Sequence, residues 1–276
     1  MESNRTTKPF KGKAIYRPTG KAGEYSAWAC NFFTGCSNNC DYCYCKRGVM
    51  SHVWTDHPKL KKCFKDEDDA MRIFVVEMWK NIKELRKSGL FFTFTSDPML
   101  PETQSLTLRA IKECIDHDIP VQILTKCADI KDLILYVASL TEDKRELIAI
   151  GFTLTCHDEM EPGASSHDDR IIALKIINEF GCRTFASIEP IITLESAGMA
   201  IKDALPYCEL FKVGLMSGGK KPDKYELLKF VRHWNSIFDK DGLKVYWKRS
   251  ISDYLGDDME YNMDSCVDAD FNIFDY

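Results

Sequence analysis

Three cysteines near the start of the chain have the spacing of an iron–sulfur ligand loop. Cys36, Cys40 and Cys43 form a C-x3-C-x2-C pattern that follows an apolar, aromatic run typical of a strand. Three thiolates on one tight loop can ligate three irons of a 4Fe–4S cluster and leave the fourth iron open to a small molecule. The pattern therefore predicts a metal centre that takes part in chemistry.

A structural zinc site is the alternative interpretation of this loop. Zinc would bind the same three cysteines, with Cys30 or Cys45 as a fourth ligand. Zinc sites usually add a second ligand pair, and the sequence has no second C-x2-C and no H-x3-H. The zinc hypothesis describes a metal-stabilised barrel that binds a partner or nucleic acid and catalyses nothing. The cluster hypothesis is preferred.

Length and composition are those of an ordinary globular chain. The 276 residues are 45% hydrophobic and 29% charged, which suits one large α/β domain. The sequence has no run of 18 apolar residues that would predict a membrane span, so no membrane partner is expected. The polar, basic start lacks the apolar core of a secretory signal. Twelve cysteines without such a signal favour the reducing cytoplasm.

Charge divides the chain unevenly. Residues 1–21 hold six basic residues and one acid, whereas residues 253–276 hold eight acids and no Lys or Arg. We expect a basic N-terminal arm over residues 1–24, a barrel over 25–250 and an acidic tail over 251–276. Both ends can be simple solvated segments. Alternatively the arm contacts a phosphate-bearing substrate, and the tail covers the barrel mouth or mimics a polyanion.

Strand-like and helix-like segments alternate along the barrel region, which predicts βα units and a parallel sheet. The expected fold is an α/β partial (β/α)6-type TIM barrel, whose active site lies at the carboxyl ends of the strands. Ser166 and Asp169 predict a helix cap. Strands are expected at 25–32, 90–95, 121–125, 147–155, 183–189, 210–216 and 244–248, and helices at 66–87, 102–118, 130–140, 166–180, 194–205 and 222–239.

The carboxyl ends of these strands are unusually polar. Because every second side chain of a strand points to the same face, the pattern predicts a lined pocket. Helix caps and loop starts also favour Ser, Thr and Asp, but that alternative does not account for buried charges. The polar residues are Thr93, Thr95, Ser96, Asp97, Thr125, Lys126, Thr153, Thr155, Ser187, Glu189, Tyr246 and Lys248.

These segments carry a family resemblance. The cysteine loop resembles the cluster motif of the radical S-adenosylmethionine (SAM) superfamily. TSDPMLPET, ILTKC, GFTLTCHDEMEPGASSHDDRI and FASIEP look like successive motifs of its spore photoproduct lyase-like branch. VYWKRS is similar to the closing strand of a phage-associated, uncharacterised radical SAM family. The resemblance covers about residues 25–250.

The resemblance implies a radical SAM enzyme with a 4Fe–4S cluster and SAM as cofactors. A reductant such as flavodoxin or ferredoxin would supply the electron, and SAM would be cleaved to a 5′-deoxyadenosyl radical that abstracts hydrogen from a substrate. Nucleic acid or a nucleotide is the favoured substrate class, and a peptide is the next. The reaction class is left open between lyase and transferase.

The resemblance also implies roles for particular residues. Cys36, Cys40 and Cys43 would ligate the cluster, Asp97 would accept from the SAM ammonium, and Lys126 would neutralise its carboxylate. Glu161 and Arg170 bind SAM or form a structural ion pair. The SAM-site set is Tyr42, Ser96, Asp97, Lys126, Thr153, Thr155, Arg170 and Glu189. The catalytic candidates are Cys156, as hydrogen donor or inert thiol, with Tyr246 and Lys248 from the closing strand.

Overall fold

The computed structural model describes residues 10–47, 51–259 and 263–275. The first nine residues of the expected arm, and residues 260–262 and 276 of the expected tail, lie outside that part of the chain. Among the described residues, none of the helices is both long and apolar enough to cross a membrane.

One open, mostly parallel sheet organises the molecule. Its strand order is β1-β2-β5-β6-β7-β8-β9-β10, and every neighbouring pair is parallel except β1 with β2. A separate hairpin pairs β3 with β4. This architecture confirms the predicted α/β partial barrel. The strands are β1 Ile15–Tyr16, β2 Ala29–Cys30, β3 Phe33–Thr34, β4 Lys59–Leu60, β5 Leu90–Phe92, β6 Val121–Thr125, β7 Ile148–Thr153, β8 Arg183–Ile191, β9 Leu210–Leu215 and β10 Lys244–Trp247.

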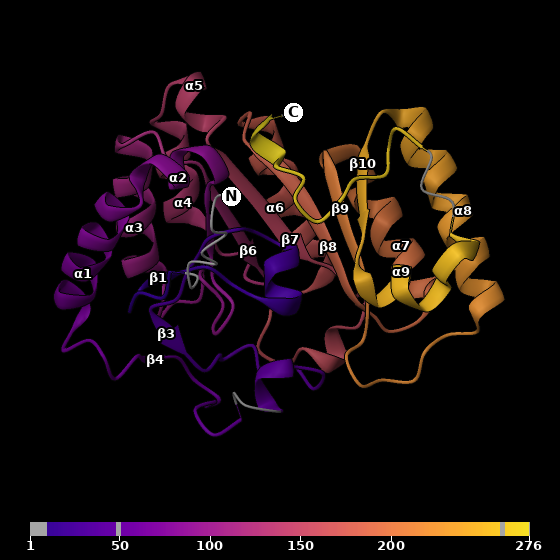
Figure 1. Cartoon of the computed structure of the whole chain (residues 1–276), viewed down its shortest axis with the longest axis horizontal. Coiled ribbons are helices and arrows are strands. Elements are labelled where there is room, and N and C mark those ends of the chain that lie inside the picture. The colour runs from indigo at the N-terminus through magenta and orange to yellow at the C-terminus, as the bar shows by residue number, and fades with distance from the viewer. Residues whose placement is uncertain (1–9, 48–50, 260–262, 276) are drawn as a thin grey trace, which may run out of the picture.

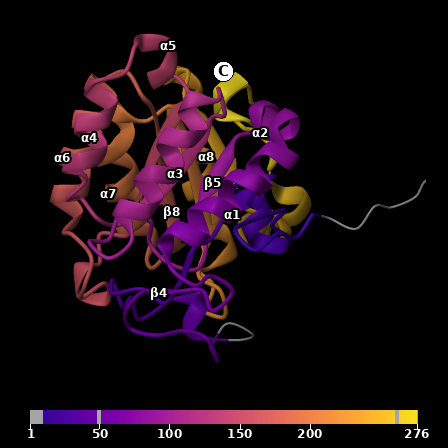
Figure 2. The same cartoon turned by 90° about the vertical axis from the view of Figure 1, so that its left-hand side faces the viewer.

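Helices cover the outer face of the curved sheet, and the β3–β4 segment lies at its lower end in Figure 1, which is also where α9 follows β10. Figure 2 shows α3, α4 and α6 side by side outside the strands. The α-helices are α1 Glu67–Lys80, α2 Ile82–Ser88, α3 Gln104–Asp116, α4 Lys131–Ala138, α5 Glu142–Arg145, α6 His167–Glu179, α7 Leu194–Ala204, α8 Lys224–Asp241 and α9 Arg249–Leu255.

Local sequence explains most of these boundaries. Ser166 caps α6 by accepting from the backbone N–H of Asp169, as predicted. The expected helix over 66–87 is divided at Asn81, whose side chain donates to the backbone carbonyl of Glu77 at 2.8 Å. Competition of this kind between a side chain and the helical ladder favours a helix end.

The two ends of the chain join the barrel. β1, which falls in the expected arm, pairs antiparallel with β2. In the tail, Ile273 is buried against Ala149, Phe185 and Leu210, which lie towards the amino ends of their strands. The described segment around Ile273 therefore packs at the opposite end from the barrel mouth, and the prediction that the tail covers the mouth is wrong for this segment. The start of the tail lies in α9, which follows the carboxyl end of β10.

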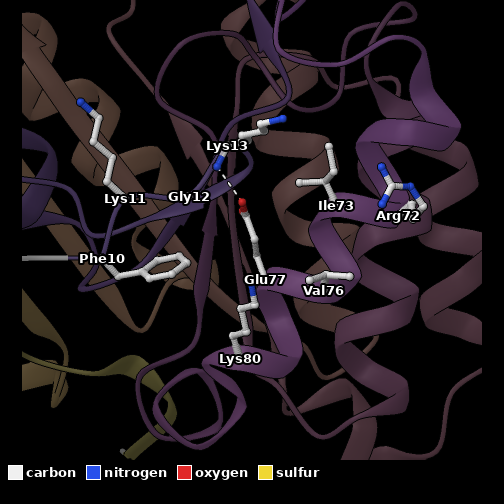
Figure 3. Close-up of a pocket in the computed structure, with 9 residues that line it drawn as sticks. All are labelled: Phe10, Lys11, Gly12, Lys13, Arg72, Ile73, Val76, Glu77 and Lys80. Atoms are coloured by element: carbon white, nitrogen blue, oxygen red, sulfur yellow. Dashed lines mark hydrogen bonds between the residues drawn. The ribbon is translucent and has the colours of Figure 1, made fainter.

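Glu77 holds the start of the chain on α1. Its carboxylate is buried and accepts the backbone N–H groups of Lys13, Ala14 and Ile15 at 2.7–3.0 Å. Figure 3 shows the bond from Lys13. Gly12 leaves room for this contact, because a Cβ there would lie 2.4 Å from the carboxylate. One acid thus fixes the position of β1 at the edge of the sheet.

We expect Glu77→Ala to lower the free energy of unfolding by about 3 kcal/mol, because three N–H donors, two of them buried, would lose a charged acceptor. Urea denaturation of the anaerobic protein measures the change. Glu84→Ala is the matched control, since Glu84 forms only an exposed ion pair with Arg17 and should change stability by no more than about 0.5 kcal/mol. Equal effects of the two substitutions would contradict the role given to Glu77.

Candidate functional site

The three cysteines of the predicted cluster loop line one cavity at the carboxyl ends of the strands. Cys36, Cys40 and Cys43 share this cavity of about 440 Å³ with residues in or just after the carboxyl-terminal parts of β5, β6, β7 and β8. The loop is held from outside by backbone bonds, from Cys36 N–H to the Thr55 carbonyl and from Asp41 N–H to the Met160 carbonyl. The three thiols therefore line one shared cavity.

The loop after β7 supports the cysteine loop. Gly163 donates its N–H to the Asn38 carbonyl at 3.1 Å. A Cβ at Gly163 would lie 1.9 Å from the carbonyl oxygen of Ser37, so only glycine fits this approach. The EPG segment of the sequence thus has a structural task that spacing alone did not reveal.

The thiols of the loop are not gathered around a single point in this structure. Ligand atoms around one tetrahedral zinc lie about 4 Å apart, because Zn–S bonds are about 2.3 Å. Of the possible fourth zinc ligands, Cys30 is buried in the core outside the cavity, while Cys45 lines it. Among the described residues, no three thiols of the loop and its neighbours lie mutually within 4.8 Å. The described thiols are therefore not arranged as three ligands of one zinc ion.

The pKa values of the loop cysteines shift in opposite directions. A hydrogen bond from Cys45 lowers the pKa of Cys43 to about 6, whereas burial raises the pKa of Cys36 to about 12. Burial opposes the charged form of Lys126, but Cys40 and Glu161 outweigh it and raise the lysine pKa above its usual value. A lasting positive charge beside the thiols favours bound thiolates and a bound carboxylate.

Asp97 ties the cysteine loop to the sheet. Its carboxylate accepts from the Asn38 side chain at 2.8 Å and from the backbone N–H of Met99 at 3.0 Å. It also accepts from the Thr125 hydroxyl at 2.6 Å and from the Lys126 N–H at 2.7 Å. Four bonds on a buried carboxylate favour a positioning role. Direct contact with a SAM ammonium, as predicted for Asp97, stays a prediction.

Other predicted SAM-site residues also line the cavity. These are Tyr42, Ser96, Lys126, Thr153 and Glu189, and the ammonium of Lys126 lies 5.6 Å from the centre of the Tyr42 ring. The Asn38 Oδ1 and Ser96 Oγ atoms are buried in the cavity wall. Within the described part of the chain they have no hydrogen-bond partner. Such atoms suit a polar ligand, because buried polar groups are normally paired.

Two residues of the predicted SAM set have internal partners and lie outside the cavity lining. Arg170 is buried, pairs with Glu161 and donates to the Thr153 carbonyl at 2.8 Å. Glu161 also accepts from the Tyr42 hydroxyl. Of the two alternatives for this pair, the geometry is that of an ion pair that orients the cavity wall. Thr155 accepts from the backbone N–H of His157 in the turn after β7.

The wall formed by β8, β9 and β10 is a charged network around Tyr25. The Tyr25 hydroxyl bonds Ser187 Oγ at 2.7 Å and Glu189 at 2.8 Å. The Lys248 ammonium lies 2.5 Å from Glu189 and 4.2 Å from the Tyr25 ring centre. The Lys212 ammonium donates to the backbone carbonyl of Tyr25 at 2.9 Å. Burial and the nearby Lys248 lower the pKa of Lys212 to about 7.

The three predicted catalytic residues do not lie together in the structure. Lys248 lines the cavity, whereas Cys156 and Tyr246 do not. Tyr246 donates to Glu24 at 2.9 Å, and Cys156 contacts the His167 ring. Burial, with Asp203 next in effect, raises the pKa of the Cys156 thiol to about 11. Catalytic roles for these three residues stay predictions, and only Lys248 lies at the cavity.

Sequence reasoning missed several contributors to the site. Asn38 lies between the cluster cysteines, and Tyr25 and Lys212 lie in predicted strands. None of the three is among the residues predicted for the site. Lys212 carried a usable signal, since a lysine in the apolar strand LFKVGL needs a buried partner. Asn38 carried none, because its contact with Asp97 depends on the tertiary fold.

A second, shallower depression of about 640 Å³ lies on the outside of the barrel, between the start of the chain and α1 (Figure 3). Its rim is basic, and the buried Glu77 lies at its floor. The lining residues are Phe10, Lys11, Gly12, Lys13, Arg72, Ile73, Val76, Glu77 and Lys80.

Comparison with known proteins places this fold among solved structures. A mutant of spore photoproduct lyase matches with a TM-score of 0.52 at 18% identity, covering 72% of this chain and 58% of that one. Streptococcus suis SuiB matches with a TM-score of 0.51 at 14% identity, covering 75% of this chain and 45% of that one. The chain thus spans about half the length of these proteins, and the predicted likeness to spore photoproduct lyase is confirmed at the level of the fold.

The sequence comparisons are more limited. An uncharacterized protein of Methanocaldococcus jannaschii is 28% identical over 189 residues, which are 66% of each chain. The chain therefore spans slightly less than two thirds of that relative. No protein-family model matches the sequence.

We expect the stability of the protein to rise with pH because of Lys212. Its pKa is about 7 when folded and 10.5 ordinarily, so between these values the unfolded chain binds the additional proton. The free energy of unfolding should rise by about 1 kcal/mol per pH unit in that window. Lys212→Met should remove this rise, whereas the exposed Lys229→Met control should keep it. Urea denaturation at several pH values measures the slopes, and parallel curves for all three proteins would contradict the assignment.

Proposed function

We propose that this protein is a radical SAM enzyme whose C-x3-C-x2-C loop binds a 4Fe–4S cluster. The observation that carries the proposal is the shared cavity, which is lined by the three thiols, the half-buried Lys126 and two polar side-chain atoms without a hydrogen-bond partner among the described residues. The fold likeness to spore photoproduct lyase and SuiB supports it, because one solved structure of each contains bound SAM.

Each side chain at the cavity has a task in this proposal. The thiolates of Cys36, Cys40 and Cys43 would hold the cluster, and the Lys126 ammonium would neutralise the SAM carboxylate. Asp97 and the Glu161–Arg170 pair would keep Asn38 and Tyr42 in place. When bound, the cluster and SAM supply a 5′-deoxyadenosyl radical. The largely apolar walls of the cavity would limit the access of water to the space where that radical meets its substrate.

We infer that the substrate is a nucleic acid or nucleotide, with a peptide as the alternative. One spore photoproduct lyase structure contains a dinucleoside spore photoproduct, which supports a nucleotide-sized ligand beside SAM. In this chain the Tyr25–Glu189–Lys248 wall offers both a hydroxyl and charges to such a ligand. We also infer a cytoplasmic enzyme reduced by a flavodoxin- or ferredoxin-like partner, with lyase and transferase chemistry both open.

The zinc-stabilised, non-catalytic barrel is the competing function. It predicts a colourless protein with stoichiometric zinc at the cysteine loop, whereas the cluster predicts a brown anaerobic protein. The wide thiol spacing and the isolation of Cys30 in the core weigh against zinc.

Substitutions at the cavity should separate cluster assembly from SAM binding. Cys40→Ala should lose both the cluster iron and SAM binding. Lys126→Ala should keep the iron but weaken SAM binding by about tenfold or more, because a charge-assisted contact is lost. Iron analysis and equilibrium dialysis of SAM with the reconstituted protein measure both properties.

Cys63→Ala is the control for this experiment, because Cys63 is exposed and does not line the cavity. It should match the wild type. Loss of iron from Lys126→Ala would show that Lys126 supports the cluster and would overturn its proposed contact with SAM.

The basic depression beside α1 should contribute to nucleic-acid binding. Lys11, Lys13, Arg72 and Lys80 surround it, and cation clusters of this kind bind phosphates in a salt-dependent way. Lys80→Glu should weaken oligonucleotide binding several-fold at low salt and reduce its salt dependence. Fluorescence anisotropy measures the affinity. Lys83→Glu, an equal charge change on exposed α2, is the control, and an equal loss in both variants would contradict a localised surface.

A further inference from the structure

A cluster of metal-ligating side chains lies apart from the cavity. Cys156 follows β7, His167 is the first residue of α6, and Asp203 is near the end of α7. One ligand atom from each residue can be chosen so that all three lie within 4.8 Å of one another. Among the described residues this is the one group of three or more His, Cys, Asp or Glu side chains with such spacing.

The distances within this group resemble those between the ligands of a single ion. Cys156 Sγ lies 3.5 Å from His167 Nδ1 and 3.6 Å from Nε2, and His167 Nε2 lies 3.1 Å from an oxygen of Asp203. Ligand atoms around tetrahedral zinc are about 3–4 Å apart, as follows from bonds of about 2.0–2.3 Å. Small side-chain rotations would therefore bring three donors onto one metal ion.

The backbone supports this arrangement. Cys156 has a φ of 54°, in the left-handed region that costs a residue with a Cβ about 1–2 kcal/mol. This conformation is kept at the point where the chain turns from β7 towards α6. Asp158 accepts the backbone N–H of His167 at 3.0 and 3.1 Å, which fixes the start of α6. The strained backbone conformation of Cys156 therefore occurs at the position where its thiol contacts the His167 ring.

The surroundings favour a cation. Asp158, Asp168 and Asp203 all act on the Cys156 thiol as negative charges, and Arg170 is the opposing cation. Arg170 is already paired with Glu161 and lies 3.8 Å from Asp158. His167 is mostly buried, with 12% of its side chain exposed, while 44% of Asp203 is exposed. An ion can therefore enter from solvent and find a partly enclosed site.

We propose that Cys156, His167 and Asp203 bind a divalent transition-metal ion, with zinc as the ion that this donor set fits best. One thiolate, one imidazole and one carboxylate form a borderline-soft set typical of zinc. Asp158 or water would complete four ligands. On binding, the Cys156 thiol releases its proton to solvent as the S–metal bond forms. The site is separate from the cysteine loop and does not depend on the proposed radical chemistry.

Such an ion would link three segments of the barrel. The turn at Cys156 begins three residues after Thr153, which lines the cavity, and α6 and α7 pack on the outside of β7 and β8. A metal that joins the turn to both helices would stabilise the part of the cavity wall formed by β7 and β8 from the outer side of the barrel. The site is therefore expected to be structural, with an effect on thermal stability.

Metal counting on the cluster-reconstituted protein tests the proposal. The protein is freed of loose metal with a chelator, dialysed against zinc and analysed for zinc and iron. The wild type should retain one more zinc per chain than Cys156→Ser, His167→Gln and Asp203→Asn, with equal iron. Each substitution should weaken zinc binding by about 100-fold or more, and zinc should raise the melting temperature of the wild type alone. Cys63→Ser, a change at an exposed thiol, is the control and should match the wild type.

Because zinc is compared between variants, failure of the cysteine loop to hold iron would not hide the result. Zinc bound at the cysteine loop would be present in every protein, so it would not change the difference in zinc content between the wild type and the variants. Asp203→Asn alters an exposed side chain and keeps the test valid if Cys156→Ser fails to fold. Equal zinc content and equal zinc-induced stabilisation in wild type, His167→Gln and Asp203→Asn would overturn the proposal.

Discussion

The buried carboxylate of Asp97 is the constraint on which the site depends. It is only 7% exposed, and a charge at such a position is costly unless it is fully hydrogen-bonded. Its partners come from the cysteine loop, from the segment after β5 and from the end of β6. Satisfying one acid therefore fixes three segments relative to one another, and with them the positions of the cluster thiols and of Lys126.

The cavity that results has two chemically different walls. On the first, Lys126, Tyr42 and the cysteines form a region suited to an anionic cofactor group. On the second, two lysines lie near Tyr25, with the Lys248 and Lys212 ammonium groups 4.2 and 5.0 Å from its ring centre. Glu189 pairs with Lys248, while the lowered pKa of Lys212 limits the total charge that is buried there. Under the proposed function, this division would give cofactor and substrate separate surfaces within one cavity.

Strongly apolar strands and capped helices were predictable from sequence. The sequence predicted β6 over Val121–Thr125 with the bounds that the structure has, because a buried apolar run between turn signals has few alternatives. The first strand was overestimated. Asn31 interrupts it and instead donates to the Tyr16 hydroxyl and accepts from the Phe94 N–H. Pairing of β1 was missed because it depends on Glu77, which is distant in the sequence.

Most of the residues predicted from the strand ends and from the cysteine spacing line one cavity, but Thr155, Arg170 and Tyr246 do not. Thr153 and Thr155 were expected on one face, but β7 ends at Thr153 and the alternation of side chains ends with it. Arg170 was expected near the cofactor, yet its pairing with Glu161 depends on how the EPG turn folds. Contacts made by turns and distant segments leave no periodic pattern to read.

The most direct test of the account is electron paramagnetic resonance of the anaerobically reconstituted, dithionite-reduced protein, before and after SAM is added. The account predicts a reduced 4Fe–4S signal that changes when SAM binds at the open iron, together with formation of 5′-deoxyadenosine. A colourless protein that assembles no cluster and holds stoichiometric zinc at Cys36, Cys40 and Cys43 would contradict it.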